Sequence, residues 1–177
     1  MVTVTPAEPP DVPAISGLMK ELDHFYGAAE EADPPGQRIS DISSALFGPA
    51  PAAYLLLARD DGELVGMASY SFLWPAAGLT RSLFLKELYV KEERKREGIG
   101  KALMHEVFRV ALERGCSRVE WQTEMTNGDA QLFYAALGAP VFDGKVFYRL
   151  TEEDAAKIVA DGPRAGAQAD RAPSTDR

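Results

Sequence analysis

The stretch K-R-E-G-I-G-K-A-L, residues 95–103, decides how this chain is expected to fold. Two glycines, Gly98 and Gly100, stand one residue apart among basic side chains, in a chain that is acidic overall. An apolar run precedes the stretch and a helix-like pattern follows it. A strand that enters a helix through glycines presents free backbone N–H groups, and the helix dipole favours an anion there. The stretch therefore predicts either a phosphate cradle or an ordinary tight loop with solvated charges.

Two common nucleotide-binding loops fit these residues poorly. A Walker A loop requires Ser or Thr after its lysine, whereas Ala102 follows Lys101. A Rossmann turn requires a third glycine, where this chain has Leu103, and a tight connection, whereas the seven charged residues 91–97 precede Gly98. Nucleotide binding is therefore the weakest of the alternatives.

The hydrophobic pattern around this stretch predicts a single mixed α/β domain. Apolar runs and alternating residues indicate strands, and apolar residues at helical spacing indicate helices. The expected strands cover residues 2–5, 53–59, 64–73, 81–90, 118–125 and 141–150; the expected helices cover the stretch after Asp11, residues 40–47, the stretch 101–114 and residues 129–137. Few large apolar side chains follow residue 154. We therefore expect a domain over residues 1–154 and a disordered tail over residues 155–177.

The composition limits the classes of function. The formal charge of −8 over 177 residues disfavours nucleic-acid binding. The single cysteine, Cys116, allows no disulfide and no cysteine-based metal site within one chain, which is typical of a reducing compartment. The N-terminus lacks the features of a signal peptide, and no apolar run approaches the roughly 20 residues that span a bilayer. We expect a cytoplasmic protein that binds neither metal nor membrane.

A second block of sequence strengthens the case for a coenzyme site. Residues 119–139, V-E-W-Q-T-E-M-T-N-G-D-A-Q-L-F-Y-A-A-L-G-A, follow the glycine stretch and its helix. With residues 88–103, L-Y-V-K-E-E-R-K-R-E-G-I-G-K-A-L, they resemble the two signature blocks of the GNAT superfamily of N-acetyltransferases. The resemblance covers residues 3–150 and is nearest to the diamine (spermidine/spermine) and thialysine branch. It implies a GNAT fold, in which about four helices flank a central, mixed, mostly antiparallel twisted sheet.

The resemblance also implies acetyl-CoA as co-substrate and the residues that hold it. These are Leu88, Tyr89, Val90, Lys95, Arg96, Glu97, Gly98, Ile99, Gly100, Lys101, Asn127, Phe133 and Tyr134. In the family, backbone N–H groups of the strand polarise the acetyl carbonyl, and the tyrosine at the position of Tyr134 often protonates the departing thiolate. Lys95 departs from the usual Arg or Gln, and Asn127 either caps the following helix, contacts the coenzyme, or does both.

The position of Tyr134 on its predicted helix offers an independent argument. The apolar stripe of that helix is Leu132, Phe133, Ala136 and Leu137. At 100° per residue, Tyr134 lies roughly 130° from the centre of this stripe. We therefore expect Tyr134 to point away from the core, either into the site or into solvent.

The general base is harder to assign. An amine must be neutral to attack, and a base therefore helps near pH 7. The diamine branch has a glutamate where this chain has Lys86; the neighbouring Glu87 is expected to face the opposite way, because side chains alternate along a strand. Glu87 and Glu124 are the candidate catalytic carboxylates. The candidates for acceptor binding are Glu21, His24, Lys86 and Glu87, with Asp23, Glu30, Tyr70 and Trp74 as further possibilities and structural roles as the alternative for each.

Together these features predict acetyl transfer by direct attack of a primary amine. The expected acceptor is a small molecule, namely a polyamine, a diamine or an amino-acid-like amine. The alternatives are an aminoglycoside or a protein amine as acceptor, or a coenzyme-A-binding sensor without catalysis. By analogy with the family, we expect a homodimer.

Overall fold

The computed structural model describes residues 1–27, 34 and 36–162. The chain divides into two compact units, Met1–Leu137 and Gly138–Arg177. The first unit contains a five-stranded sheet and the helices α1 to α4. This confirms the mixed α/β class that the hydrophobic pattern predicts.

The sheet keeps its strands in the order of the sequence. Its first four strands are antiparallel neighbours, and the fifth runs parallel to the fourth. The strands are β1 (Val2–Pro6), β2 (Tyr54–Asp60), β3 (Glu63–Leu73), β4 (Arg81–Val90) and β5 (Cys116–Glu120). Asp61 and Gly62 turn the chain between β2 and β3, both with positive φ, as the D-D-G sequence indicates. The sheet is therefore mixed and mostly antiparallel, as predicted.

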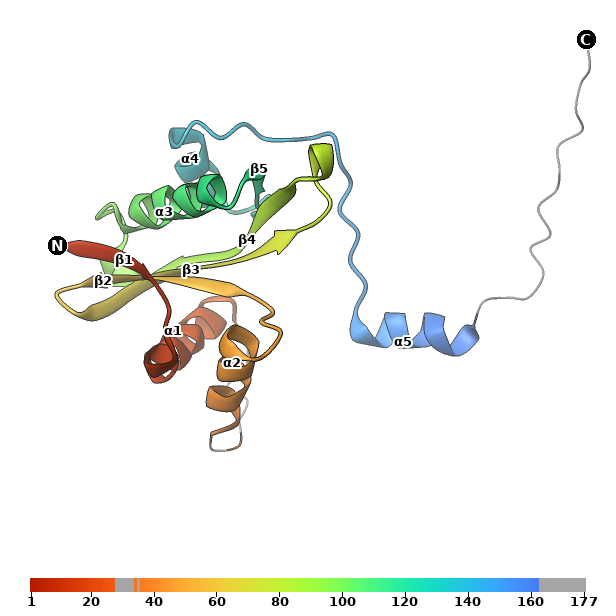
Figure 1. The fold of residues 1–177 in the computed structure, drawn as a ribbon, viewed down its shortest axis with the longest axis horizontal. Helices are drawn as coiled ribbons and strands as arrows, with labels where there is room; N and C mark the ends of the chain where they lie inside the picture. Colours follow the sequence, from red (N-terminus) through yellow and green to blue (C-terminus); the bar gives the residue numbers. More distant parts are fainter. Residues whose placement is uncertain (28–33, 35, 163–177) are drawn as a thin grey trace, which may run out of the picture. The chain divides into compact units, whose positions relative to one another are not determined.

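Helices cover both faces of this sheet (Figure 1). One face carries α1 (Val12–Phe25) and α2 (Gln37–Phe47), and the other carries α3 (Ile99–Glu113) and α4 (Gly128–Ala136). Successive side chains of β2 point to opposite faces of the sheet, so this strand contributes to the core on each face. Leu57 packs with Ile15 of α1, and Leu56 packs with Leu103 of α3. The strand β4 lies under both cores and leads directly into the glycine stretch.

The region after α3 differs from the prediction in two ways. The strand β5 ends at Glu120, five residues before the predicted end at residue 125. The buried side of α4 is formed by Phe133, Tyr134 and Leu137, whereas Leu132 is 72% exposed. The predicted apolar stripe therefore holds at Phe133 and Leu137 and was wrong at Leu132 and Ala136, because Tyr134 packs beside Trp121.

The second unit also differs from the prediction. Residues 141–150 form no strand, because a strand requires a hydrogen-bonded neighbour and the described residues provide none for this segment. A helix, α5 (Glu152–Asp161), occupies residues that we expected to lack secondary structure. Thr151 caps it by accepting a hydrogen bond from the Asp154 N–H (3.1 Å), and three acidic residues occupy its first turn. The rest of the predicted tail, residues 163–177, lies outside the described residues.

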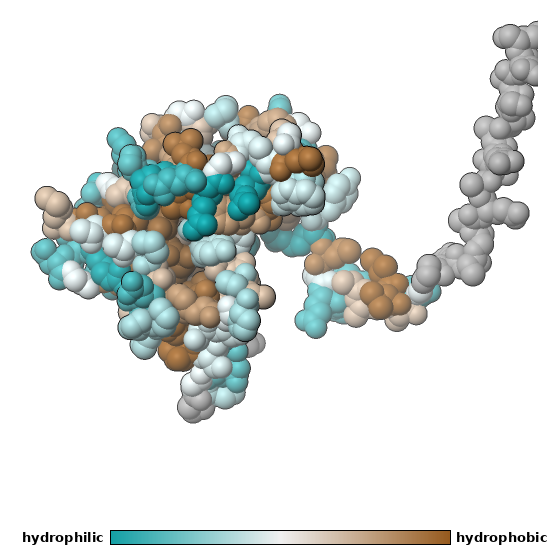
Figure 2. Space-filling model, in the orientation of Figure 1, coloured by the Kyte–Doolittle hydropathy of each residue, from teal (hydrophilic) through white to brown (hydrophobic). Residues whose placement is uncertain are grey.

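Hydrophobic side chains are exposed in the second unit (Figure 2). The most exposed are Val141, Phe142, Val146, Phe147, Tyr148, Leu150, Ile158 and Val159. Within the described part of the chain, no helix combines the length and the apolarity that a bilayer-spanning segment requires.

Candidate functional site

Strand β4 has two sheet neighbours along only part of its length. Its pairing with β3 continues to Val90, whereas its pairing with β5 ends where Phe84 faces Glu120. Between Leu85 and Val90, no strand within the described ranges pairs with the β5 side of β4. The backbone groups that β4 presents on this side therefore have no strand partner among the described residues.

The glycine stretch connects this open end of β4 to α3. Arg96 and Gly98 both have positive φ, 66° and 84°, so the chain turns sharply before α3 begins at Ile99. Gly98 lies at the N-cap of α3 without a side-chain cap, and Ala102 donates the helix hydrogen bond to Gly98 O (3.0 Å). The N–H groups between these two residues precede that bond and have no acceptor inside an α-helix. The loop therefore offers N–H donors to an anion, which is what the phosphate-cradle prediction requires.

The charged residues of the loop have different environments. The Arg94 guanidinium donates to Asp60 Oδ2 of β2 (2.7 Å) and to Glu97 Oε2 (2.9 Å), which fastens the loop to the sheet. Lys95 pairs with Glu92, and its ammonium lies 5.0 Å from the centroid of the Phe25 ring. Arg96 and Lys101 are exposed near the N-terminus of α3, where they can face an anionic ligand.

A bulge at Lys86 sets the direction of Glu87. In the pairing with β3, Leu85 faces Tyr70 and Glu87 faces Ser69, so Lys86 is an extra residue in β4. The β4 residues packed on the α3 side are Leu83, Leu85, Leu88 and Val90. Strict alternation therefore does not hold across Lys86, and Glu87 reaches towards the C-terminal end of α1.

At that end of α1, the Tyr26 hydroxyl donates a hydrogen bond to Glu87 Oε1 (2.8 Å). Burial raises the pKa of the Glu87 carboxyl, and the hydrogen bond from Tyr26 and the charge of Lys86 offset part of this effect. Burial, followed by the hydrogen bond to Glu87, raises the pKa of Tyr26 to about 12. Tyr26 is therefore a donor at neutral pH, and Glu87 is its acceptor.

Tyr134 of α4 lies within electrostatic range of the same carboxylate. Its pKa is raised by burial and, to a lesser degree, by the negative charge of Glu87. The ring of Tyr134 lies against Trp121 and Phe133, with centroid distances of 5.1 and 5.2 Å. A half-buried phenol with a raised pKa keeps its proton at neutral pH, which suits a proton donor.

The segment between β5 and α4 completes this region. Asn127 caps α4 by accepting a hydrogen bond from the Ala130 N–H (3.1 Å), so the predicted structural role is confirmed. Glu124 is exposed, and its charge contributes to the raised pKa of Tyr26. Phe133 packs beside Gly100, where an added Cβ would lie 3.4 Å from its ring. The structure thus brings Glu87, Glu124 and Tyr134 around Tyr26, next to the glycine loop.

Other predicted site residues are engaged elsewhere or exposed. Glu21 forms an ion pair with Lys91 (3.9 Å), and Asp23 forms one with Arg38. His24 and Lys86 are exposed, and Glu30 lies outside the described residues. Trp74, with 70% of its surface exposed, follows β3, and its indole N–H donates to Leu79 O (3.2 Å).

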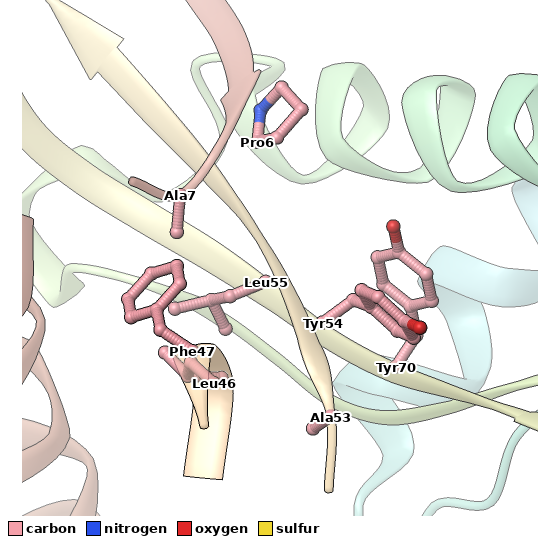
Figure 3. A pocket seen from close by; sticks show the side chains of 8 residues that line it. All are labelled: Pro6, Ala7, Leu46, Phe47, Ala53, Tyr54, Leu55 and Tyr70. Carbon is pink, nitrogen blue, oxygen red and sulfur yellow. The ribbon is translucent and has the colours of Figure 1, made fainter. Parts of the chain in front are cut away.

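Tyr70 belongs to a separate apolar hollow between β2, β3 and the end of α2 (Figure 3). The rings of Tyr54 and Tyr70 stack there with their centroids 5.6 Å apart. The hollow measures about 70 Å³, well below the volume of typical ligand pockets. Its residues are Pro6, Ala7, Leu46, Phe47, Ala53, Tyr54, Leu55 and Tyr70. We therefore assign Tyr70 to core packing rather than to an acceptor pocket.

Tyr26 is the site residue that the sequence analysis missed. Its contact with Glu87 joins residues 61 positions apart, and no local pattern signals such a pair. Within the described residues, no group of three His, Cys, Asp or Glu side chains is arranged to hold a metal ion. The thiol of Cys116 is partly buried, and burial raises its pKa, which is typical of a structural cysteine.

The sequence and the fold of this chain are both similar to those of known proteins. The model of the acetyltransferase (GNAT) family matches residues 16–139. The chain is 29% identical over 148 residues to a thialysine N-epsilon-acetyltransferase of Bos taurus, covering 78% of this chain and 84% of the relative. It is 28% identical over 151 residues to a D-amino-acid N-acetyltransferase of Saccharomyces cerevisiae, covering 84% and 89%. The solved structure of an integron cassette protein from the mobile metagenome of V. cholerae superposes with a TM-score of 0.78 at 25% identity, covering 89% and 97%.

Proposed function

Because the chain belongs to the GNAT family and is an N-acetyltransferase, we propose that it moves the acetyl group of acetyl-CoA directly to a primary amine of a small molecule. One observation carries this proposal. A half-buried carboxylate, Glu87, and a half-buried phenol, Tyr134, lie within electrostatic range of each other beside the open edge of β4. A proton acceptor and a proton donor thus flank the place where a thioester entering along β4 would lie.

The residues present fit acetyl-CoA as co-substrate, which supplies the activated acetyl thioester. The glycine loop, with Gly98 and the first N–H groups of α3, is suited to the pyrophosphate. Arg96 and Lys101 add positive charge at the same end of the helix. At Leu88–Val90 the edge of β4 has no β5 partner. Backbone N–H groups there are proposed to donate hydrogen bonds to the amide groups of the coenzyme and to the acetyl carbonyl oxygen.

The transfer requires one proton to leave and one to arrive. The amine nitrogen bonds to the acetyl carbon, and the bond between that carbon and sulfur breaks. In our proposal Glu87 accepts the proton released by the amine, directly or through water, with Glu124 as the alternative acceptor. Tyr134 gives its proton to the departing thiolate. The raised pKa of Glu87 makes it a stronger base than an ordinary carboxylate, and Tyr134 is protonated at neutral pH, as a proton donor must be.

The acceptor is proposed to be a cationic, amino-acid-like amine or a polyamine. Glu87 and Glu124 supply negative charge around Tyr26, and the chain as a whole has a formal charge of −8. Two relatives act on thialysine and on D-amino acids, which supports an amino-acid-like acceptor. An aminoglycoside or a protein amine is the alternative acceptor class.

Release of free coenzyme A thiol from acetyl-CoA tests the proposal directly. The candidate acceptor amines to be compared are polyamines, lysine analogues, D-amino acids, an aminoglycoside and a basic peptide. We expect turnover with a small amine and a fall in kcat of about 10²-fold or more for Tyr134→Phe. Tyr54→Phe, which removes a hydroxyl in the small hollow, serves as the matched control and should leave kcat unchanged. Absence of release with every amine would contradict the proposed function.

The oligomeric state and the cellular compartment of the protein are also proposed. We propose a cytoplasmic homodimer that binds neither nucleic acid nor membrane. The exposed apolar side chains of residues 141–159 support self-association, because a second copy would remove them from water. Light scattering coupled to gel filtration measures the mass directly, and a monomer at micromolar concentration would contradict the dimer.

A further inference from the structure

The C-terminal end of α1 brings an aromatic side chain to the catalytic carboxylate. Tyr26 directly follows α1, and its hydroxyl lies 2.8 Å from Glu87 Oε1 of β4. Most of the Tyr26 side chain is exposed, since the residue has 62% of its surface accessible. Burial alone therefore does not explain its placement, and the hydrogen bond is its specific contact with the strand.

Neighbouring residues hold this end of α1 in place. The Phe25 ring lies edge-on to Tyr26, with a centroid distance of 5.4 Å, and edge-on to Tyr89 of β4, at 6.5 Å. The Lys95 ammonium covers the Phe25 ring from the side of the glycine loop, 5.0 Å from its centroid. Tyr26 is thus fixed between β4 and the loop that faces the coenzyme, rather than placed at random on the surface.

The groups that face Glu87 come from each element around it. Lys86 lies beside it on β4, Tyr26 approaches from α1, and Tyr134 approaches from α4. Glu124 acts on Tyr26 from the segment between β5 and α4. The Tyr26 hydroxyl is the side-chain donor to this carboxylate, and the backbone of Leu88 forms a further hydrogen bond to it. Loss of the Tyr26 hydroxyl would leave the half-buried carboxylate with the backbone hydrogen bond alone.

We propose that Tyr26 is a positioning residue of the acceptor site: its hydroxyl holds one oxygen of Glu87 and thereby directs the other oxygen towards the amine that is acetylated. This inference rests on the proposed function, since it places the acceptor amine at Glu87. A carboxylate that rotates more freely would spend less time aligned with the amine, and one that has lost a donor would be protonated at a higher pH. Tyr26 therefore acts through Glu87 and does not itself exchange a proton.

The pH dependence of kcat/KM for the amine distinguishes this role from a merely structural one. Tyr26→Phe removes a hydrogen bond that favours the ionised carboxylate, so the pKa of Glu87 should rise further. The acidic limb of the profile should then move to higher pH. Below that limb, kcat/KM of the variant should be about tenfold or more lower than that of the wild type, and above the limb the difference should be smaller. The KM for acetyl-CoA should stay unchanged. In Glu87→Gln the acidic limb should disappear, and adding Tyr26→Phe should cause little further loss.

A carbon-13 NMR titration of the Glu87 carboxyl gives a readout independent of turnover. The midpoint should lie above that of an ordinary glutamate in the wild type and higher still in Tyr26→Phe, and the assigned signal should be absent in Glu87→Gln. Tyr54→Phe should change neither the titration nor the rate profile. If the wild type is active but Tyr26→Phe moves neither the acidic limb of kcat/KM nor the midpoint of the NMR titration, the role of Tyr26 alone is overturned. A wild type that releases no coenzyme A with any amine would overturn the proposed function and the acceptor role together.

Discussion

The two halves of strand β4 share the neighbour β3 on one side, but only the first half has a neighbouring strand on the other side. Over Ser82–Phe84 the strand is paired with β3 and β5, and Ser82 and Leu83 are buried. Over Leu85–Val90 it keeps β3 but has no β5 partner within the described residues, and it contains a bulge and a half-buried carboxylate. One strand therefore provides both a closed piece of sheet and an open edge.

This difference shows how the fold separates stability from chemistry. In the first half, hydrogen bonds on both edges and burial on both faces leave nothing for a ligand to contact. In the second half, the bulge at Lys86 turns Glu87 towards α1, and the departure of β5 leaves backbone groups without a strand partner among the described residues. Substitutions in the first half should therefore act mainly on stability, and those in the second half on both stability and turnover.

The largest expected effect on stability lies in the closed half. Leu83 is fully buried in the core beneath α3, and Leu83→Ala should lower the free energy of unfolding by about 3–5 kcal/mol. Leu88, on the same side of the strand in the open half, is only partly buried, and Leu88→Ala should cause about half that loss. Urea unfolding of both variants makes the comparison. Equal losses would show that the two halves are equally packed.

A smaller effect is expected from Gly66, which faces Val90 at the open end of β4. An added Cβ would lie 2.7 Å from the Tyr89 carbonyl oxygen, a backbone atom that moves only if β4 moves. Gly66→Ala should therefore lower the free energy of unfolding by about 1–3 kcal/mol. It should also lower kcat/KM for acetyl-CoA by about tenfold or more, because the displaced segment offers its backbone to the thioester.

Gly17→Ala is the matched control for this substitution. Gly17 lies inside α1, and an added Cβ would meet no atom within 4 Å. Alanine should therefore stabilise the helix, by roughly 0.5–1 kcal/mol, and leave the kinetics unchanged. If Gly66→Ala proved as harmless as Gly17→Ala, the close contact between β3 and β4 would not restrict the open half.

Sequence patterns were sufficient for the features that depend on neighbours along the chain. The alternation of β2 to β4 and the helical spacing of α1 and α3 follow from burial of one face at a time. The two glycines at residues 98 and 100 predicted a strand–loop–helix junction, because only a few residue types allow such a turn. These elements were correct to within a few residues of their boundaries.

The missed features depend on contacts between distant segments. The bulge at Lys86 is a property of two strands, so alternation within β4 alone does not predict that Glu87 reaches α1. The apolar residues of α4 predicted its buried face only in part, because Trp121 provides a surface for Tyr134 that no helical pattern reveals. Tyr26 was overlooked because its partner is 61 residues away.

A still smaller effect is expected at Asn127, whose side chain caps the helix that carries Tyr134 over the open half. Asn127→Ala should lower the free energy of unfolding by about 1 kcal/mol, and Asn127→Ser should restore most of it, because serine also caps helices. A contact with the coenzyme would appear separately, as a rise in the KM for acetyl-CoA that Asn127→Ser fails to correct. Unchanged stability of Asn127→Ala would contradict the capping role.

The smallest effect, with the opposite sign, is expected for Glu87→Gln. The folded-state pKa of Glu87 lies above that of the unfolded chain, so the folded state binds more protons between these two values. The contribution of Glu87 to the free energy of unfolding therefore falls as the pH rises through that window, which opens near pH 4 (about 4.3 for an unfolded glutamate). Glutamine keeps an acceptor for Tyr26 but carries no charge, so the variant should gain stability relative to wild type as the pH approaches 7.

Chemical unfolding of wild type and Glu87→Gln at a series of pH values measures this difference. The gain should be smaller than the loss in Asn127→Ala, because the Tyr26 hydrogen bond and the charge of Lys86 offset part of the burial. Glu124→Gln, at an exposed carboxylate of the same region, is the control for the loss of one negative charge. A variant that is more stable yet less active would show that the open half of β4 retains a buried charge for chemistry at the expense of stability. A difference independent of pH would mean that Glu87 is solvated like an ordinary surface glutamate.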